Sequence, residues 1–367
     1  MAVTENMYHF SGEQNIDSPA LIYYQDIITA NIKHAISMAG DAGRLWPHVK
    51  THKMEAMIHL QMSMGIRRFK CATIAEAEMT ARCGAEHILL AYPLIGPAID
   101  RFIRLRERYA RTEFWAIGDN TEQLALLGKA AGRDIPVLAD INLGMDRTGV
   151  TLDKLEAFCL TLAGIPGLAL KGFHGYDGHL GIKDLAERQQ AVEKKWERLR
   201  VVQEALERRS ITLPVLVMGG TPTFPCYQAH GNVFLSPGTL FVNDHGYSEK
   251  YHDLDFTPGA AILSRVISHP AAGLFTLDLG SKAIAADPIG ERGVIAGLSQ
   301  AQPAAQSEEH WVFRLEGQER PPIGAVLYVI PTHICPTTAL YPGVPVVQNG
   351  RMVNYWEVTA RNRKLSI

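Results

Sequence analysis

The regular alternation of strand-like and helix-like segments over the first two thirds of the chain limits the fold more than any other feature. Short apolar runs typical of strands occur at residues 18–24, 48–51, 68–71, 88–91, 113–117, 136–142, 168–174 and 214–218. Segments with helical spacing lie between most of them, at residues 26–39, 74–83, 98–110, 121–131, 152–163 and 184–209. This order predicts a parallel sheet with crossover helices. About eight units of this kind suit a closed (β/α)8 barrel, and periodicity alone leaves an open doubly wound sheet as the alternative.

The pattern changes after about residue 253. Short strand-like runs follow one another, several beside proline or glycine, at residues 260–268, 274–279, 293–296, 310–315, 325–329 and 351–358. Long helical patterns disappear, and residues 300–306 are interpreted as a polar loop. The C-terminal part is therefore predicted to be an all-β domain.

Composition excludes several classes of protein. The 367 residues are 47% hydrophobic and 20% charged with a formal net charge of −2, so no basic field suggests nucleic acid. Residues 1–17 are polar and lack the apolar core of a signal peptide, and no apolar run approaches the ~20 residues that a membrane span needs. An odd number of scattered cysteines, 71, 83, 159, 226 and 335, fits a reducing cytoplasm. We expect a cytoplasmic protein with no membrane partner.

A lysine between two histidines ends one of the early apolar runs. If residues 48–52 form a strand, then His48, Lys50 and His52 point to the same side. A lysine crowded and desolvated in this way has a lowered pKa and becomes a nucleophilic amine, as Schiff-base chemistry requires. Spacing alone favours the alternative, a solvated surface lysine between two ordinary histidines.

The stretch Pro47-His48-Val49-Lys50-Thr51-His52-Lys53 resembles the lysine motif of the D-threonine aldolase and D-serine dehydratase family. These are pyridoxal 5′-phosphate (PLP) enzymes of fold-type III, similar to alanine racemase in their N-terminal half. The resemblance recurs along nearly the whole chain. It implies an α/β plus all-β protein, with a TIM-type PLP-binding barrel at residues 26–250 and a β-domain at residues 251–367 joined by residues 1–25. It also implies that Lys50 binds PLP covalently, with Lys53 as a bystander.

Other candidate residues follow the predicted strands, because catalytic groups of a barrel gather at the carboxyl ends of its strands. The glycine-rich loop after Asp140 carries Arg147, and the resemblance implies that this arginine reaches the PLP ring hydroxyl. Pairing of Arg147 with Asp140 or Asp146 is the alternative.

The stretch at residues 173–181 is rich in histidine and glycine. The resemblance implies that His174 packs against or bonds to the PLP ring, and that His179 and Tyr176 face the substrate. A capped turn with surface histidines is the alternative, although so many reactive groups at a strand end favour function.

Two turns resemble phosphate-binding turns. In the first, Gly219, Gly220 and Thr221, with the Thr223 hydroxyl, follow an apolar strand. Glycine frees backbone N–H groups for an anion, and the last strands of barrels often bind phosphate. The second turn contains Ser236, Gly238 and Thr239.

The predicted β-domain contains a His-x-Cys pair, His333 and Cys335. In an extended segment the two side chains point the same way, but two ligands are too few for a structural zinc site. Spacing alone favours a buried structural cysteine beside a loop histidine. The resemblance implies a divalent metal here. Cysteine favours zinc, whereas the family's aldolases often have aspartate and use manganese.

The resemblance implies a D-threonine aldolase that cleaves D-β-hydroxy-α-amino acids to glycine and an aldehyde, with His179 as the base. A D-serine or D-threo-3-hydroxyaspartate dehydratase is the main alternative: Lys50 would take the Cα proton, and the products would be a 2-oxo acid and ammonia. An amino-acid racemase and a non-catalytic PLP-binding protein are further alternatives. A homodimer is expected from the resemblance alone.

Overall fold

The computed structural model describes residues 7–367, which divide into two compact units that interleave along the chain. The β unit comprises residues 7–35, Thr51–Ala56 and Thr239–Arg361. The barrel unit comprises Ile36–Lys50, Met57–Gly238 and Asn362–Ile367. The domain limits expected from the sequence remain predictions, and residues 1–6 of the predicted N-terminal segment lie outside the described residues.

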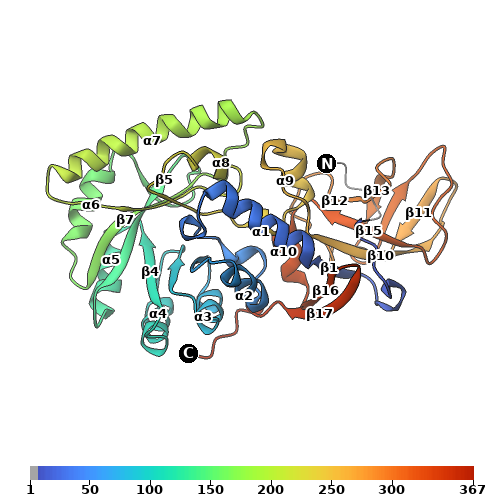
Figure 1. Cartoon of the computed structure of the whole chain (residues 1–367), viewed down its shortest axis with the longest axis horizontal. Coiled ribbons are helices and arrows are strands. Elements are labelled where there is room, and N and C mark those ends of the chain that lie inside the picture. The colour runs from blue at the N-terminus through green and yellow to red at the C-terminus, as the bar shows by residue number, and fades with distance from the viewer. Residues whose placement is uncertain (1–6) are drawn as a thin grey trace. The chain divides into compact units, whose positions relative to one another are not determined.

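The barrel unit contains a curled parallel sheet (Figure 1) in the order β2-β3-β4-β5-β7-β8-β9. The strands are β2 (Arg68–Cys71), β3 (His87–Leu90), β4 (Glu113–Gly118), β5 (Ile135–Asn142), β7 (Leu168–Tyr176), β8 (Val215–Met218) and β9 (Val233–Leu235), and the short β6 (Val150–Thr151) pairs with β5. Residues 45–48 join the two edges, because Leu45 forms a parallel bridge with Leu235 and His48 forms one with Lys70. The predicted eight-stranded barrel is confirmed.

The prediction of a strand over residues 48–51 is wrong. Strand pairing ends at His48, whose N–H donates to the Pro237 carbonyl (2.8 Å), and Val49–Thr51 form a 3-10 helix, η4. The local histidines cap this turn: His48 Nδ1 accepts from the Lys50 N–H (3.3 Å) and His52 Nδ1 accepts from the Met54 N–H (3.1 Å). The two histidines therefore do not flank Lys50 along one strand face.

All six predicted helices are present, and side chains cap the starts of three of them. The helices up to residue 230 are α1 (Gln25–Ala39), α2 (Glu55–Ser63), α3 (Ile74–Arg82), α4 (Pro97–Arg108), α5 (Thr121–Ala130), α6 (Leu155–Ala163), α7 (Leu185–Glu207) and α8 (Phe224–Tyr227). Thr73, Asn120 and Asp184 accept from backbone N–H groups at the starts of α3, α5 and α7. Helices α4 to α7 lie outside the strands (Figure 1). None of the helices within residues 7–367 has both the length and the apolar character needed to cross a membrane.

The β unit contains a nine-stranded sheet within the described residues, which confirms the predicted C-terminal β-domain architecture. Its strands are β1 (Ala20–Tyr24), β10 (Ala260–Ser268), β11 (Leu274–Leu277), β12 (Gly293–Ile295), β13 (Gln302–Gln306), β14 (Trp311–Arg314), β15 (Val326–Pro331), β16 (Gly343–Gln348) and β17 (Arg351–Glu357), with short helices α9 (His245–Lys250) and α10 (Ile334–Leu340). The prediction of a loop is wrong for residues 302–306, which form β13 because they pair with the apolar strand β14.

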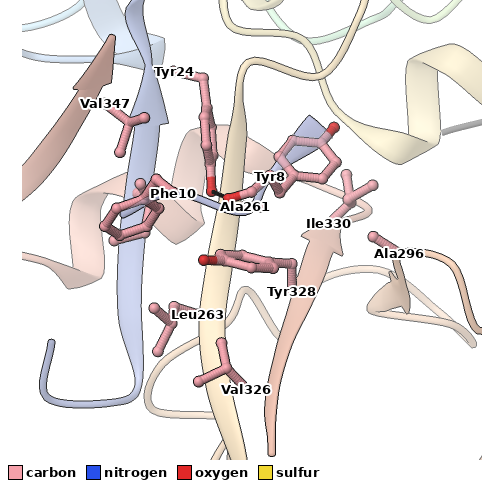
Figure 2. Packing of buried hydrophobic residues seen from close by; sticks show 11 residues of the cluster. Tyr8, Phe10, Tyr24, Ala261, Leu263, Ala296, Val326, Tyr328, Ile330 and Val347 are labelled. Atoms are coloured by element: carbon pink, nitrogen blue, oxygen red, sulfur yellow. Dashed lines mark hydrogen bonds between the residues drawn. The ribbon is translucent and has the colours of Figure 1, made fainter. Parts of the chain in front are cut away.

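The core of the β unit gathers aromatic side chains from distant parts of the chain (Figure 2). Tyr8 and Tyr24 meet edge to face with ring centroids 5.0 Å apart, and the Tyr24 hydroxyl donates to the Tyr8 carbonyl (2.7 Å). Tyr328 of β15 lies against the Tyr8 ring at 6.1 Å. Residues near the start of the described chain therefore pack in the same core as strands from its last third.

Gly172→Ala should destabilise the barrel unit by about 3 kcal/mol, because overpacking against a rigid backbone forces neighbouring strands apart. A Cβ at Gly172 in β7 would lie 1.7 Å from the Val215 carbonyl oxygen of β8. Denaturant unfolding measures the change. Gly231→Ala is the matched control, since a Cβ there meets no atom within 4 Å. Equal stability of the two variants would contradict the prediction.

Candidate active site

Three cationic side chains surround the ring of Tyr176 at the carboxyl end of β7. Lys50 Nζ lies 5.6 Å from the ring centroid, Lys70 Nζ 5.8 Å and the Arg147 guanidinium carbon 5.2 Å. These distances are within the range of cation–π attraction. The structure thus brings together Lys50, Arg147 and Tyr176, which the sequence singled out, and adds a second lysine that it did not.

Lys70 lies on β2 with only 2% of its surface exposed. Burial, and then the charge of Lys50, lowers the pKa of Lys70 to about 7. Asp140 and Asp177 oppose this shift weakly. Sequence reasoning missed this residue, although a lysine inside an apolar barrel strand is itself a usable signal.

His174 lies on β7 within the barrel and is almost fully buried. Burial lowers the pKa of His174, and the nearby Asp140 carboxylate only partly offsets this, so the ring is neutral. Nδ1–H then donates to Asp140 Oδ1 at 2.7 Å, while Nε2 has no hydrogen-bond partner among the described residues.

The two carboxylates proposed as alternative partners of Arg147 both have other partners. Asp140 accepts from His174, and Asp146 accepts from the Asn142 side chain (2.9 Å).

The parts of the two predicted phosphate-binding turns that belong to the barrel unit are neighbours, whereas Thr239 of the second turn belongs to the β unit. The Gly238 N–H approaches Thr221 Oγ1 at 3.4 Å. Gly219 has φ +79°, a left-handed conformation that favours glycine, and its N–H donates to the Gly175 carbonyl (2.8 Å). A Cβ at Gly220 would lie 2.7 Å from the Tyr176 ring, so only glycine fits this close approach.

Three hydroxyl groups expected near phosphate have other partners. Ser236 Oγ donates to the Trp46 carbonyl (2.8 Å), and Thr223 Oγ1 donates to Asp177 (2.5 Å). Thr239 Oγ1 lies 3.4 Å from Cys335 Sγ. The hydrogens of Ser236 and Thr223 are therefore committed to protein acceptors.

His179 is exposed and lies beside the loop that follows β5. A Cβ at Gly144 would lie 3.5 Å from His179 Nε2 and 3.8 Å from Lys195 Nζ, so both groups flank this glycine. Lys195 Nζ donates to the Leu143 carbonyl (2.5 Å). Partial burial and the Lys195 charge lower the pKa of His179, which keeps its imidazole available as a proton acceptor.

The His-x-Cys pair is not in an extended segment, so that prediction is wrong. Strand β15 ends at Pro331, His333 is the N-cap residue of α10, and Cys335 lies in its first turn. The backbone leaves the extended conformation because the buried Asp244 carboxylate accepts from the Ile334 N–H (3.0 Å) at the start of the helix. The two side chains are nevertheless hydrogen-bonded to each other.

The pair has strongly shifted acid–base properties. Burial acts to raise the pKa of the Cys335 thiol, but hydrogen bonds from His333, Thr239 and Thr51 outweigh it, so the net shift is downward. Burial acts against the His333 imidazolium, yet Cys335 and Asp287 raise the pKa of His333 to about 9. Asp287 Oδ2 lies 2.5 Å from His333 Nδ1, and Thr51 Oγ1 lies 3.2 Å from Cys335 Sγ.

An imidazole and an acidic thiol in contact are suitable ligands for a soft divalent metal. Three or more His, Cys, Asp or Glu side chains do not cluster as metal ligands anywhere in residues 7–367.

The sequence matches two family descriptions that divide the chain in the same way as its secondary structure. Residues 25–244 match "Alanine racemase, N-terminal domain", and residues 259–347 match "Putative serine dehydratase domain". Among curated proteins, the chain is 29% identical over 362 residues to a D-threonine aldolase of Arthrobacter sp, covering 94% of this chain and 93% of that one. It is 26% identical over 370 residues to a 3-hydroxy-D-aspartate aldolase of Paracoccus denitrificans, covering 96% and 94%.

Among solved structures, D-threonine aldolase from Filomicrobium marinum superposes with a TM-score of 0.89 at 26% identity, covering 96% of this chain and 98% of that one. Fold and matched domains define an alanine racemase-like barrel enzyme with an added β-domain. The chain belongs to the D-threonine aldolase and D-serine dehydratase family, whose alanine racemase-like barrel implies PLP as cofactor.

The barrel unit contains groups that fit PLP. PLP is an aromatic aldehyde with a phosphate monoester, so it needs an amine, hydrogen-bonding partners for its ring and an anion-binding turn. The amine of Lys50, the unpaired Nε2 of His174 and the glycine turn at Gly219 and Gly220 provide these groups within one unit.

Proposed function

We propose that the protein is a PLP- and divalent-metal-dependent D-threonine aldolase, which cleaves D-β-hydroxy-α-amino acids to glycine and an aldehyde. One observation supports this most directly. Thr51, the residue that follows the predicted PLP lysine in the chain, contacts Cys335 of the predicted metal pair at 3.2 Å. Thr51 and Cys335 both belong to the β unit, and Thr51 directly follows Lys50 in the sequence.

In this proposal Lys50 holds PLP covalently through its amine, and Arg147 and His174 hold the ring. Gly219, Gly220, Thr221, Ser236, Gly238 and Thr239 form the phosphate-binding turns, of which Thr221 and the backbone groups are the stronger candidates because Ser236 donates elsewhere. PLP, when bound, supplies an electron sink for the bond that breaks at Cα. Tyr176 fixes the positions of the cations around it and faces the substrate.

His333 and Cys335 would hold a zinc or manganese ion, which would polarise the β-hydroxyl of the substrate. His179 takes the hydroxyl proton, directly or through a water molecule, and this proton loss drives cleavage of the Cα–Cβ bond. The downward shift of the His179 pKa supports its role as a base. Cytoplasmic location and a homodimer remain predictions that accompany this proposal.

The dehydratase is the second candidate, favoured by the Cys335 ligand and by the match of residues 259–347 to a putative serine dehydratase domain. Here Lys50 takes the Cα proton and hydroxide leaves from Cβ, so a D-serine or D-threo-3-hydroxyaspartate substrate gives a 2-oxo acid and ammonia. A racemase requires a catalytic tyrosine for which the β-domain sequence offers no good match. A non-catalytic PLP-binding protein does not account for His333 and Cys335.

A product assay tests the proposal. Purified protein with PLP is incubated with D-threonine or L-threonine in the presence of Mn²⁺, Zn²⁺ or EDTA, and acetaldehyde is measured. We expect acetaldehyde from D-threonine only, and only with metal. Equal activity in EDTA would contradict metal dependence, and activity of His333→Ala equal to that of the unchanged protein would contradict the metal site.

Asp287→Ala should weaken metal binding by about 10- to 100-fold, because a carboxylate that holds the second nitrogen of a ligating histidine fixes the ring orientation. Asp287 Oδ2 is 2.5 Å from His333 Nδ1. Calorimetric titration with Zn²⁺ measures the affinity, and exposed Asp17→Ala is the control of equal charge change. Unchanged affinity in Asp287→Ala would show that this carboxylate does not orient His333 for metal binding.

A further inference from the structure

Asp177 is a fully buried carboxylate that follows Tyr176 at the end of β7. Two hydroxyl groups donate to it: Thr223 Oγ1 to Oδ1 at 2.5 Å and the Tyr227 hydroxyl to Oδ2 at 2.9 Å. Both donors come from the segment after β8, since Thr223 ends the Gly-Gly-Thr-Pro-Thr turn and Tyr227 is in α8. One carboxylate therefore fastens both parts of this segment to the end of β7.

Thr223 connects this carboxylate to the backbone of the turn. Its hydrogen points to Asp177, so an oxygen lone pair is left to accept the Gly220 N–H at 3.1 Å. Gly219 is held from the same side, because its N–H donates to the Gly175 carbonyl (2.8 Å) and a Cβ on it would lie 3.0 Å from Thr223 Oγ1. The position of the Gly220 N–H thus depends on where the Thr223 hydroxyl is held, and Gly219 lies beside the same oxygen.

A buried carboxylate without an arginine or lysine hydrogen-bonded to it lowers the free energy of unfolding, because its charge has been removed from water. Burial raises the pKa of Asp177, and the hydrogen bonds from Thr223 and Tyr227 oppose this by favouring the charged form. An asparagine at this position would avoid the cost but would offer only one acceptor oxygen. Both acceptors of Asp177 are in use, so the two bonds account for the presence of a carboxylate.

We propose that Asp177, acting through the Thr223 hydroxyl, is a positioning residue that holds the Gly219–Gly220 turn in the shape that binds the phosphate monoester of PLP. The Thr223 hydrogen is donated to Asp177, so Thr223 would act through the backbone of the turn and not as a hydrogen-bond donor to the phosphate. The inference rests on the proposed function, because it takes the turn after β8 as the phosphate-binding turn. It predicts an effect confined to the phosphate end of the cofactor.

Thr223→Val tests the inference, because valine has nearly the same shape and removes both hydrogen bonds. The dissociation constants of PLP and of pyridoxal, which lacks the phosphate, are measured by absorbance titration. We expect Thr223→Val to raise the dissociation constant of PLP by about tenfold or more, which is the scale of a lost pair of buried hydrogen bonds. The dissociation constant of pyridoxal should change by no more than about twofold. Thr223→Ser keeps the hydroxyl and should bind PLP like the unchanged protein.

Two further variants keep the inference open to contradiction if Thr223→Val folds poorly. Asp177→Asn should weaken the binding of PLP more than the binding of pyridoxal. Tyr227→Phe loses a hydrogen bond that does not reach the turn, so it should change PLP binding less than Thr223→Val does. Equal weakening of PLP and pyridoxal, or no weakening of PLP, overturns the inference while the unchanged protein still binds PLP. An unchanged protein that binds neither compound overturns the proposed function itself.

Discussion

Replacing Lys50 with alanine should abolish covalent capture of PLP and lower kcat/KM for D-threonine by roughly a thousandfold or more, the scale on which loss of a covalent catalytic group acts. The Lys50 amine lies beside Tyr176 with Arg147 on the same ring. Without it the amine that the proposal assigns to the imine is missing, and the Lys70 amine, 5.8 Å from the same ring, is not expected to replace it. The absorbance of the imine and the mass added to the protein after borohydride reduction both measure covalent capture of PLP.

Lys53→Ala is the control for this experiment. Lys53 is three residues further along, has a left-handed backbone with φ 54°, and belongs to the β unit, where its carbonyl accepts from the Ala360 N–H (3.1 Å). We expect Lys53→Ala to capture PLP and to react at close to the unchanged rate. Reduction that labels Lys53 instead of Lys50 would overturn the assignment of the motif.

Replacing Lys70 with methionine should raise the free energy of unfolding of the PLP-free protein at pH 7 by about 2–4 kcal/mol, while impairing PLP binding. Burial lowers the pKa of Lys70 from 10.5 to about 7, so the unfolded chain binds a proton that the folded chain gives up. The penalty is absent above pH 10.5, grows as the pH falls, and is complete below about pH 7. The gain from Lys70→Met should follow the same pH dependence.

Denaturant unfolding at pH 7 and pH 10 measures this effect. Lys171→Met is the matched control, because Lys171 is exposed on β7 and its replacement should change stability by no more than about 0.5 kcal/mol. A stabilised protein that binds PLP weakly would indicate that the buried amine is retained for the site rather than for the fold. Destabilisation by Lys70→Met would contradict the burial penalty.

The order of barrel strands and helices could be predicted because each depends on a local pattern. The apolar run before Asp140 and the long helical pattern of α7 lie where the sequence placed them. Residues 48–51 and 333–335 misled prediction for a shared reason. In both places an apolar run continues into residues whose conformation is determined by residues far away in the sequence. Strand pairing with residue 237 ends at His48, and the buried Asp244 carboxylate accepts from the backbone at the start of α10.

The candidate site could be predicted only as far as motifs extend. Lys50, Arg147 and Tyr176 were found because each lies in a recognisable stretch, and the structure brings them around one ring. The contributions of Lys70 and Asp177 depend on contacts between residues more than 40 positions apart, as in the Asp177–Thr223 bond. The residues next to Lys70 and Asp177 in the sequence do not indicate these partners, because burial and long-range hydrogen bonding arise only in the closed barrel.

Product analysis by NMR tests the central claim most directly. D-threonine labelled with ¹³C at Cα and Cβ is incubated with the PLP-loaded protein and Mn²⁺, and the labelled products are followed in one sample. The proposed function predicts that the ¹³C–¹³C coupling is lost as labelled glycine and acetaldehyde form. Labelled 2-oxobutyrate that keeps the coupling, with release of ammonia, would contradict the aldolase and would identify a dehydratase.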